Sequence, residues 1–155
     1  MAGRIEARLK DLGITLPEAA APVANYIPWT RSGNLLIVSG QLPWKNGEIH
    51  PVGKVGAAVT AEEAKDAAGM AFLFCLAHAK VATGGDLDRV ARVLRLGGFI
   101  NAAPGFTALP AVMNGASDLA VAIFGEAGRH ARTTIGVAEL PGGATVEVEA
   151  MFELA

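Results

Sequence analysis

Apolar residues recur at every third or fourth position in three stretches of the chain, the spacing of an amphipathic helix. The first stretch, Gly3 to Leu12, is short and is followed by Gly13, a residue that favours a helix end. The second runs from Thr60 to about Thr83, and the third spans Leu109 to Phe124. The pattern therefore predicts one short N-terminal helix and two long helices.

The first long helix carries both a start and a stop signal. Thr60 and Glu63 have the spacing of a capping box, in which each side chain binds the backbone amide of the other residue. Gly84 and Gly85 follow the helix and end it. Its apolar stripe is narrow and made mostly of small residues, which suits close packing on a sheet: Ala64, Ala68, Ala71, Phe72, Cys75, Ala79 and Ala82.

Runs of β-branched and alternating apolar residues predict the strands. Tyr26 to Arg31 and Leu35 to Gln41 form a hairpin around a turn at Gly33, and Asn46-Gly47 predicts a second turn. Two further strands end the chain, and the second alternates apolar and polar residues cleanly; they span Ala131 to Ala138 and Thr145 to Glu153.

The strand predicted over Arg89 to Ile100 is apolar in both alternation phases, which is typical of an inner strand covered on both faces. Gly97-Gly98 within it predicts a kink or bulge. With two long helices on one face of a mixed sheet, the fold class is α+β. Because the helices leave the second face of this strand open, we expect a neighbouring subunit to cover it.

The composition narrows the class of protein. The chain has 155 residues, of which 52% are apolar and 18% charged, a composition typical of one ordered domain. We expect this domain to span residues 1–155, with an N-terminal helix and connection over 1–24 and a core over 25–155. A net charge of −2 argues against a nucleic-acid partner. No apolar run reaches the roughly 18–20 residues that cross a membrane, and no secretory signal is present, so we expect a soluble, cytoplasmic protein.

Several kinds of chemistry are disfavoured by the sequence. The three histidines share no metal-ligand spacing, so neither a metal nor another cofactor is expected. Gly53-Lys54-Val55-Gly56 lacks the spacing of a phosphate-binding loop. Cys75 lies in mid-helix among apolar neighbours, where a thiol behaves as a small apolar group. No serine lies in a G-x-S-x-G motif.

Charged residues near the C-terminus remain as candidates. Arg132 begins an apolar strand, and a guanidinium there needs a partner. That partner is either a structural carboxylate or the carboxylate of a bound substrate. Glu147 and Glu149 share the polar face of the last strand, where they are either solvated or functional.

Five segments in this order resemble the RidA/YjgF family, formerly called the L-PSP endoribonucleases. They are Asn25-Tyr26, Gly33 to Pro43 with its S-G-Q-x-P sequence, His130 to Val137, Leu140-Pro141 and Val146 to Ala150. The resemblance covers about residues 25 to 153. It implies a chorismate-mutase-like fold and a homotrimer whose ligand clefts lie between subunits.

The resemblance also implies a deaminase and its site. Arg132 corresponds to the arginine that binds the carboxylate of an enamine or imine derived from an amino acid. Glu147 corresponds to the glutamate that positions or activates the attacking water, and ammonia is released. Residues implied to line the same cleft are Tyr26, Ser39 and Gly40.

Two positions depart from the family pattern. Thr134 stands where a cysteine is frequent, and the family's helix asparagine falls on either Asn114 or Ser117.

Two other functions compete with a deaminase. One is a non-catalytic protein that binds a small carboxylate or ketoacid in the same cleft. The other is an endoribonuclease, which the acidic net charge disfavours.

Overall fold

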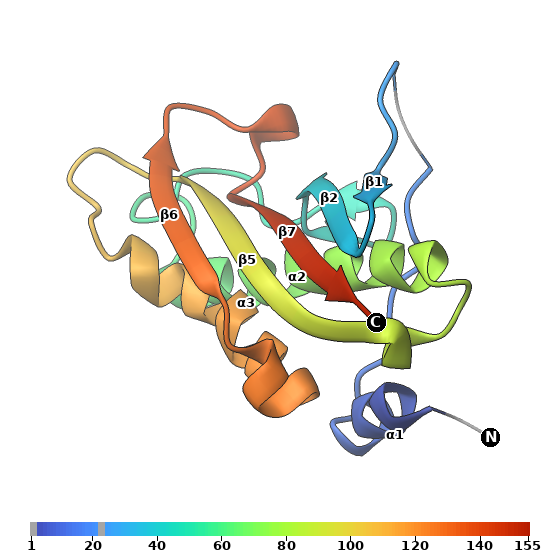
Figure 1. Cartoon of the computed structure of the whole chain (residues 1–155). Helices are drawn as coiled ribbons and strands as arrows, with labels where there is room; N and C mark the ends of the chain where they lie inside the picture. Colours follow the sequence, from blue (N-terminus) through green and yellow to red (C-terminus); the bar gives the residue numbers. More distant parts are fainter. Residues whose placement is uncertain (1–2, 22–23) are drawn as a thin grey trace.

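A five-stranded mixed sheet forms the centre of the computed structural model, which describes residues 3–21 and 24–155 (Figure 1). The strand order is β1-β2-β7-β5-β6, and only β5 and β6 are parallel. The strands are β1 (Trp29–Ser32), β2 (Leu35–Gln41), β5 (Val90–Asn101), β6 (Ala131–Val137) and β7 (Val146–Leu154). This order makes β6 one edge of the sheet and places β7 at its centre.

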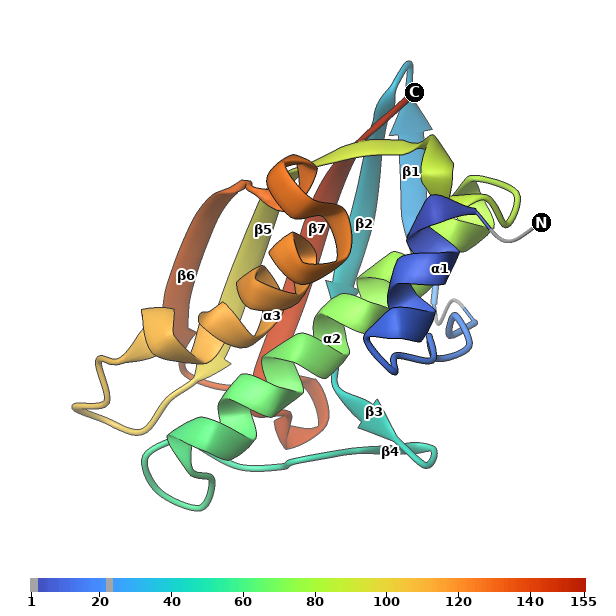
Figure 2. The same cartoon turned by 90° about the horizontal axis from the view of Figure 1, so that it is seen from below.

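Both long helices cover the same face of this sheet, as Figure 2 shows. They are α2 (Ala61–Ala82) and α3 (Leu109–Phe124). The core lies between these helices and the strands, and its largest fully buried side chains include Phe72, Leu76, Met113 and Phe152. The predicted α+β class is therefore confirmed.

The ends of α2 lie where the sequence predicts them. The Thr60 amide donates to Glu63 Oε2 at 2.8 Å, and the Glu63 amide donates to Thr60 Oγ1 at 3.1 Å, which completes the capping box. After the helix, Gly84 and Gly85 have φ angles of 70° and 93°, a region that favours glycine. Further along, a Cβ at Gly115 of α3 would overlap the Lys65 carbonyl oxygen, so glycine permits the close approach of α2 and α3.

The N-terminal helix α1 (Arg4–Asp11) buries Ile5 and Leu9. Its first residues have no side-chain cap of their own. Instead, the amides of Arg4 and Ile5 each donate to the Asp88 carboxylate at 2.8 Å. These hydrogen bonds to the ionised form lower the pKa of Asp88. The short 3₁₀ turn η1 (Leu87–Arg89) thus anchors α1 on the core.

The remaining elements are short. A small hairpin of β3 (Trp44–Lys45) and β4 (Glu48–Ile49) turns at Asn46-Gly47, as predicted. Two further 3₁₀ turns complete the chain, η2 (Gly125–Gly128) after α3 and η3 (Pro141–Gly143) before β7.

The observed strands differ from the prediction in two places. The first strand begins at Trp29, three residues later than predicted, because Pro28 has no amide hydrogen to donate to the sheet. The predicted kink at Gly97-Gly98 is wrong, since β5 pairs with β7 without a break from Arg95 to Ile100. These glycines provide space instead: a Cβ at Gly97 would lie 2.6 Å from Glu149 Oε1, and one at Gly98 would lie 2.6 Å from Met113 Sδ.

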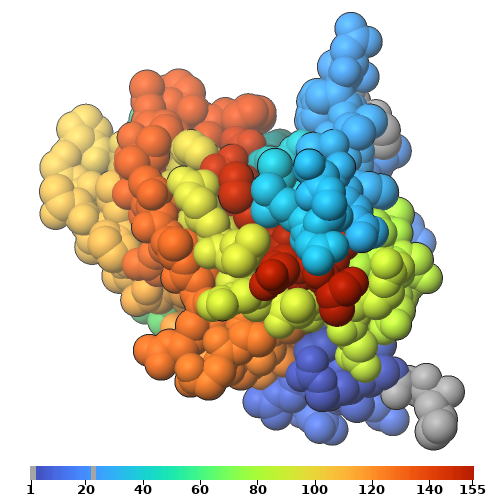
Figure 3. Space-filling model, in the orientation of Figure 1, coloured from blue at the N-terminus to red at the C-terminus, as the bar shows by residue number. Residues whose placement is uncertain are grey.

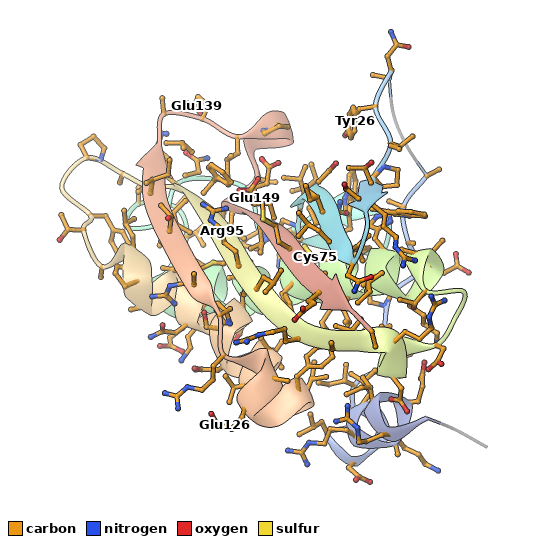
Figure 4. All side chains as sticks on the ribbon, viewed as in Figure 1. Tyr26, Cys75, Arg95, Glu126, Glu139 and Glu149 are labelled. Atoms are coloured by element: carbon orange, nitrogen blue, oxygen red, sulfur yellow. The ribbon has the colours of Figure 1, made fainter. Side chains whose placement is uncertain are left out.

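The face of β5 that points away from the helices is also less apolar than predicted. It presents Arg95, Gly97 and Phe99, and Arg95 Nη1 forms an ion pair with Glu149 Oε1 at 2.9 Å (Figure 4). The alternation prediction failed because the register shifts between Val93 and Arg95. This open sheet face, which is turned toward the viewer in Figure 3, therefore mixes charged and apolar groups.

Candidate functional site

Arg132 is the second residue of the edge strand β6, and its side chain reaches toward α3. Nη1 donates to Asn114 Oδ1 at 2.8 Å and to Ser117 Oγ at 3.1 Å, while Nη2 lies 3.5 Å from the Pro110 carbonyl oxygen. Both candidates for the helix asparagine of the family therefore contact Arg132. The structure brings these three predicted site residues together.

The partners of Arg132 carry no negative charge. Within the described part of the chain, no carboxylate forms an ion pair with it, so the structural carboxylate considered as one of its two possible partners is not found there. The two hydrogens of Nη1 are used by Asn114 and Ser117. The Nε–H and the parallel N–H of Nη2 remain, and this pair has the spacing that binds a carboxylate through two hydrogen bonds.

Thr134 lies two residues further along β6, on the same side of the strand as Arg132. Its hydroxyl oxygen is buried and has no hydrogen-bond partner among the described residues. A buried polar group without a partner costs free energy, which a ligand or water can recover. We call Arg132, Asn114, Ser117 and Thr134 the Arg132 cluster.

Glu147 lies on β7 and points to the open sheet face, opposite Phe99. A Cβ at Gly40 of β2 would overlap Glu147 Oε1, so the absent side chain at Gly40 gives the carboxylate its space. Burial raises the pKa of Glu147, and the nearby charge of Glu149 raises it further. A carboxylate with a raised pKa near a cleft is a candidate proton acceptor.

Tyr26, Ser39 and Gly40 lie at the β1–β2 side of the sheet, and Gly40 adjoins the Glu147 carboxylate. Ser39 Oγ donates to the Ile27 carbonyl at 3.1 Å, which holds the segment carrying Tyr26 against β2. Tyr26 and Gly40 line a cavity of about 180 Å³ whose other walls include Gln41, Trp44 and His78. We call Tyr26, Ser39, Gly40 and Glu147 the Glu147 cluster.

The two clusters are separated within one chain. β5 lies between β7 and β6, so two steps of about 4.8 Å place the strands of Glu147 and Arg132 about 10 Å apart, and β2 lies one step further from β6. Arg132 pairs with Leu96 and shares its helix-covered face, whereas Glu147 points to the open face. Tyr26 is labelled in Figure 4 on the side of the sheet opposite β6. A small molecule therefore cannot contact both clusters of the same chain at once.

Sequence reasoning missed His130. Ser117 Oγ lies 2.9 Å from His130 Nε2, and His130 Nδ1 lies 2.6 Å from the Gly128 carbonyl oxygen. Ser117 comes from α3 and His130 precedes β6, so the contact depends on how α3 packs beside that strand. No periodicity or motif in the sequence indicates it.

The Cys75 thiol is a structural group. Cys75 is fully buried, its Sγ donates to the Val148 carbonyl at 3.3 Å, and burial raises the pKa of its thiol, which makes it a poor nucleophile.

Among residues 3–21 and 24–155, no three His, Cys, Asp or Glu side chains come close enough to hold a metal ion. The helices described here are all too short or too polar to cross a membrane.

The raised pKa of Glu147 predicts a pH-dependent effect on stability. The folded state holds the Glu147 proton more tightly than the unfolded state does. The stability linked to that proton is present below the unfolded pKa, near 4.3, and is lost as the pH rises through the folded pKa. Glu147→Gln, which cannot ionise, should therefore raise the melting temperature at pH 7.5 and change it little at pH 4. A melting-temperature gain of equal size at both pH values would contradict this prediction.

Comparisons with known proteins identify the family. Residues 6–153 match the family model described as "YjgF/chorismate mutase-like, putative endoribonuclease". Protein TCP17 of Trypanosoma cruzi is 49% identical over 153 residues, which cover 98% of this chain and 95% of that protein.

Two solved structures have the same overall fold. A protein of unknown function from Agrobacterium tumefaciens is 47% identical, with a TM-score of 0.91 over 98% of this chain and 93% of that one. A "putative endoribonuclease" from Shewanella oneidensis is 37% identical, with a TM-score of 0.93 over 97% and 99% of the two chains. The match spans nearly the whole sequence, and the chain belongs to the YjgF/chorismate-mutase-like family, of which the RidA proteins are members.

Proposed function

We propose that this protein is a deaminase that hydrolyses small 2-imino or 2-enamino acids to ketoacids and ammonia. The uncompensated guanidinium of Arg132 carries the proposal. Among the described residues its charge meets only neutral acceptors, and its Nε–Nη2 edge meets no side-chain acceptor there that would compete with a substrate carboxylate. Such an anchor fixes the reacting carbon of a small acid relative to the groups around it.

Glu147 supplies the proton acceptor in this proposal. It takes a proton from water while the water oxygen bonds to the imine carbon, and the C=N π electrons move to nitrogen, which takes up a proton. The hydroxyl of the resulting carbinolamine then gives up its proton and the amino nitrogen gains one, so that the C–N bond breaks, a carbonyl forms and ammonia leaves. An enamine first takes a proton at carbon to become the imine. No oxidant, reductant or metal takes part.

The separation of the two clusters requires two chains at each cleft. In a homotrimer of the kind the family resemblance implies, the Arg132 cluster of one subunit faces the Glu147 cluster of its neighbour. The free edge of β6 supports this arrangement, because an edge strand presents unpaired backbone groups that a second chain can cover.

The assembly should therefore be a homotrimer in solution. Light scattering coupled to size exclusion is expected to give a mass three times the 15.9 kDa of the chain. A monomer at micromolar concentration would remove the shared cleft and the deaminase mechanism with it.

A non-catalytic carboxylate-binding protein is the second candidate. The observation that favours it is the completeness of the Arg132 cluster, which needs no residue from the Glu147 cluster to hold an anion. An endoribonuclease is less consistent with the structure, since Glu147, Glu149 and Glu153 share the open sheet face and would repel phosphates.

A coupled assay tests the deaminase proposal. An amino-acid oxidase generates imines from a panel of amino acids, semicarbazide traps the imine that remains, and the protein is added in increasing amounts. A deaminase reduces trapping of at least one imine in proportion to its concentration. Unchanged trapping across the panel, in a protein that binds 2-oxobutyrate, would instead identify the binding protein.

Arg132→Lys tests the anchor. Lysine keeps the charge but loses the two parallel N–H groups, so affinity for 2-oxobutyrate should fall by one to two decades, about 1.5–3 kcal/mol. Calorimetric titration measures the affinity, and a melting curve of the same sample reports folding. Arg129→Lys, on the exposed turn before β6, is the matched control and should bind as the wild type does. Unchanged affinity in a folded Arg132→Lys trimer would remove the anchor.

A further inference from the structure

A continuous chain of hydrogen bonds leads from the backbone to the Arg132 guanidinium. It begins at the Gly128 carbonyl, passes through both ring nitrogens of His130 and reaches Ser117 Oγ. Ser117 Oγ then accepts from Arg132 Nη1 at 3.1 Å. The four groups come from the middle of α3, the turn η2, the residue before β6 and the start of β6.

The chemistry of the end groups sets the direction of each bond. A carbonyl oxygen only accepts, so His130 Nδ1 must carry a hydrogen and donate to Gly128. In a neutral ring the other nitrogen, Nε2, is then an acceptor and receives the Ser117 hydroxyl hydrogen. With its hydrogen turned toward His130, the Ser117 oxygen directs its lone pairs to the guanidinium.

We propose that His130 is a positioning residue that acts through Ser117 to hold the carboxylate-binding edge of Arg132 in place. The inference rests on the proposed function of Arg132 as the carboxylate anchor. His130 itself contacts the guanidinium only through Ser117 and does not contact the substrate.

The reason lies in what Ser117 would do without His130. A serine inside a helix tends to donate its hydroxyl hydrogen to the carbonyl four residues earlier, here that of Met113. His130 Nε2 offers a competing acceptor on the β6 side of α3 and so turns the hydroxyl. Together with Asn114, the oriented Ser117 oxygen occupies both hydrogens of Nη1. The Nε–Nη2 edge is thereby left to the ligand, and less side-chain entropy is lost when the ligand binds.

Titration of 2-oxobutyrate into single and double variants tests the coupling. His130→Phe and Ser117→Ala should each weaken binding by about three- to tenfold, the scale of one hydrogen bond. In the Ser117→Ala background, His130→Phe should add nothing, because its effect passes through the hydroxyl. His130→Gln, whose amide oxygen can accept from Ser117, should recover part of the affinity.

His50→Phe is the matched control, since His50 is exposed on the loop after β4 and lies in neither cluster. It should leave the affinity unchanged. If His130→Phe lowers the melting temperature but not the affinity, or weakens binding equally with and without Ser117, the positioning role is overturned. In the imine assay the same variants should raise KM with little change in kcat.

A ligand-free measurement separates this proposal from the proposed function. Long-range ¹H–¹⁵N NMR reports which ring nitrogen of a histidine carries the hydrogen, and the chain has only three histidines. The His130 signal, identified by its loss in His130→Gln, should show the Nδ1–H form, and Ser117→Ala should shift its Nε2 resonance. An Nε2–H form would overturn the inference, even if the wild type binds ketoacids. Failure to bind any ketoacid, with the Nδ1–H form observed, would instead count against the anchor.

Discussion

Trimers assembled from a mixture of Arg132→Ala and Glu147→Gln chains are expected to regain about a quarter of the wild-type deaminase activity, although each variant alone is nearly inactive. In a cyclic trimer each cleft takes Arg132 from one subunit and Glu147 from the next. Any trimer that contains both variants has one cleft in which both residues are native. With equal and random mixing, about three quarters of the trimers are of this kind.

The measurement uses co-refolded or co-expressed chains that carry different affinity tags, so that the presence of mixed trimers can be verified, and activity is measured on the unsorted mixture. If one chain supplied both residues to its own cleft, no mixed trimer would contain an intact site and activity would stay at the level of the parents. The control is a mixture in which one chain carries both substitutions and the other carries neither. Wild-type chains mixed equally with the Arg132→Ala/Glu147→Gln double variant should retain about a quarter of the activity, rather than the half expected for a site within one chain.

The elements that the sequence predicted best are those specified by local chemistry. The capping box at Thr60 and Glu63 and the glycines after α2 depend only on nearby backbone groups, so their positions could be predicted directly. The faces of β5 could not, because the register shift between Val93 and Arg95 changes which residues face the helices. Alternation alone does not show where such a shift occurs.

For the candidate site, too, the sequence indicated individual residues but not their arrangement in space. The family resemblance indicated Arg132 and Glu147, but it could not show that they occupy opposite faces of the sheet within one chain. That arrangement follows from the strand registers, because Arg132 pairs with Leu96 of β5 whereas Glu147 pairs with Phe99, which lies on the other face of the same strand. The contact between Ser117 and His130 likewise requires α3 to pack against the start of β6. The contacts between segments that lie far apart in the sequence were therefore the part of the site that could not be predicted from the sequence.

Glu147→Gln is expected to lower kcat for imine hydrolysis by about 10²–10⁴-fold, the usual contribution of a positioned general base. Glutamine keeps the shape of the side chain and its fit beside Gly40, but it cannot accept a proton from water. Because the carboxylate anchor lies in the other cluster, affinity for 2-oxobutyrate should change little. Steady-state kinetics and titration on the same trimer measure the two quantities.

Glu149→Gln is the matched control for this prediction. Glu149 points to the same face of β7 two residues later, so the two substitutions remove equal charge from neighbouring positions. The Glu149 carboxylate is held by Arg95 at 2.9 Å, an ion pair that restricts its access to a water in the cleft. Its replacement should therefore reduce kcat by no more than a few-fold, about the worth of a partly exposed ion pair. If Glu149→Gln loses more turnover than Glu147→Gln, with both trimers folded, the catalytic carboxylate has been assigned to the wrong residue.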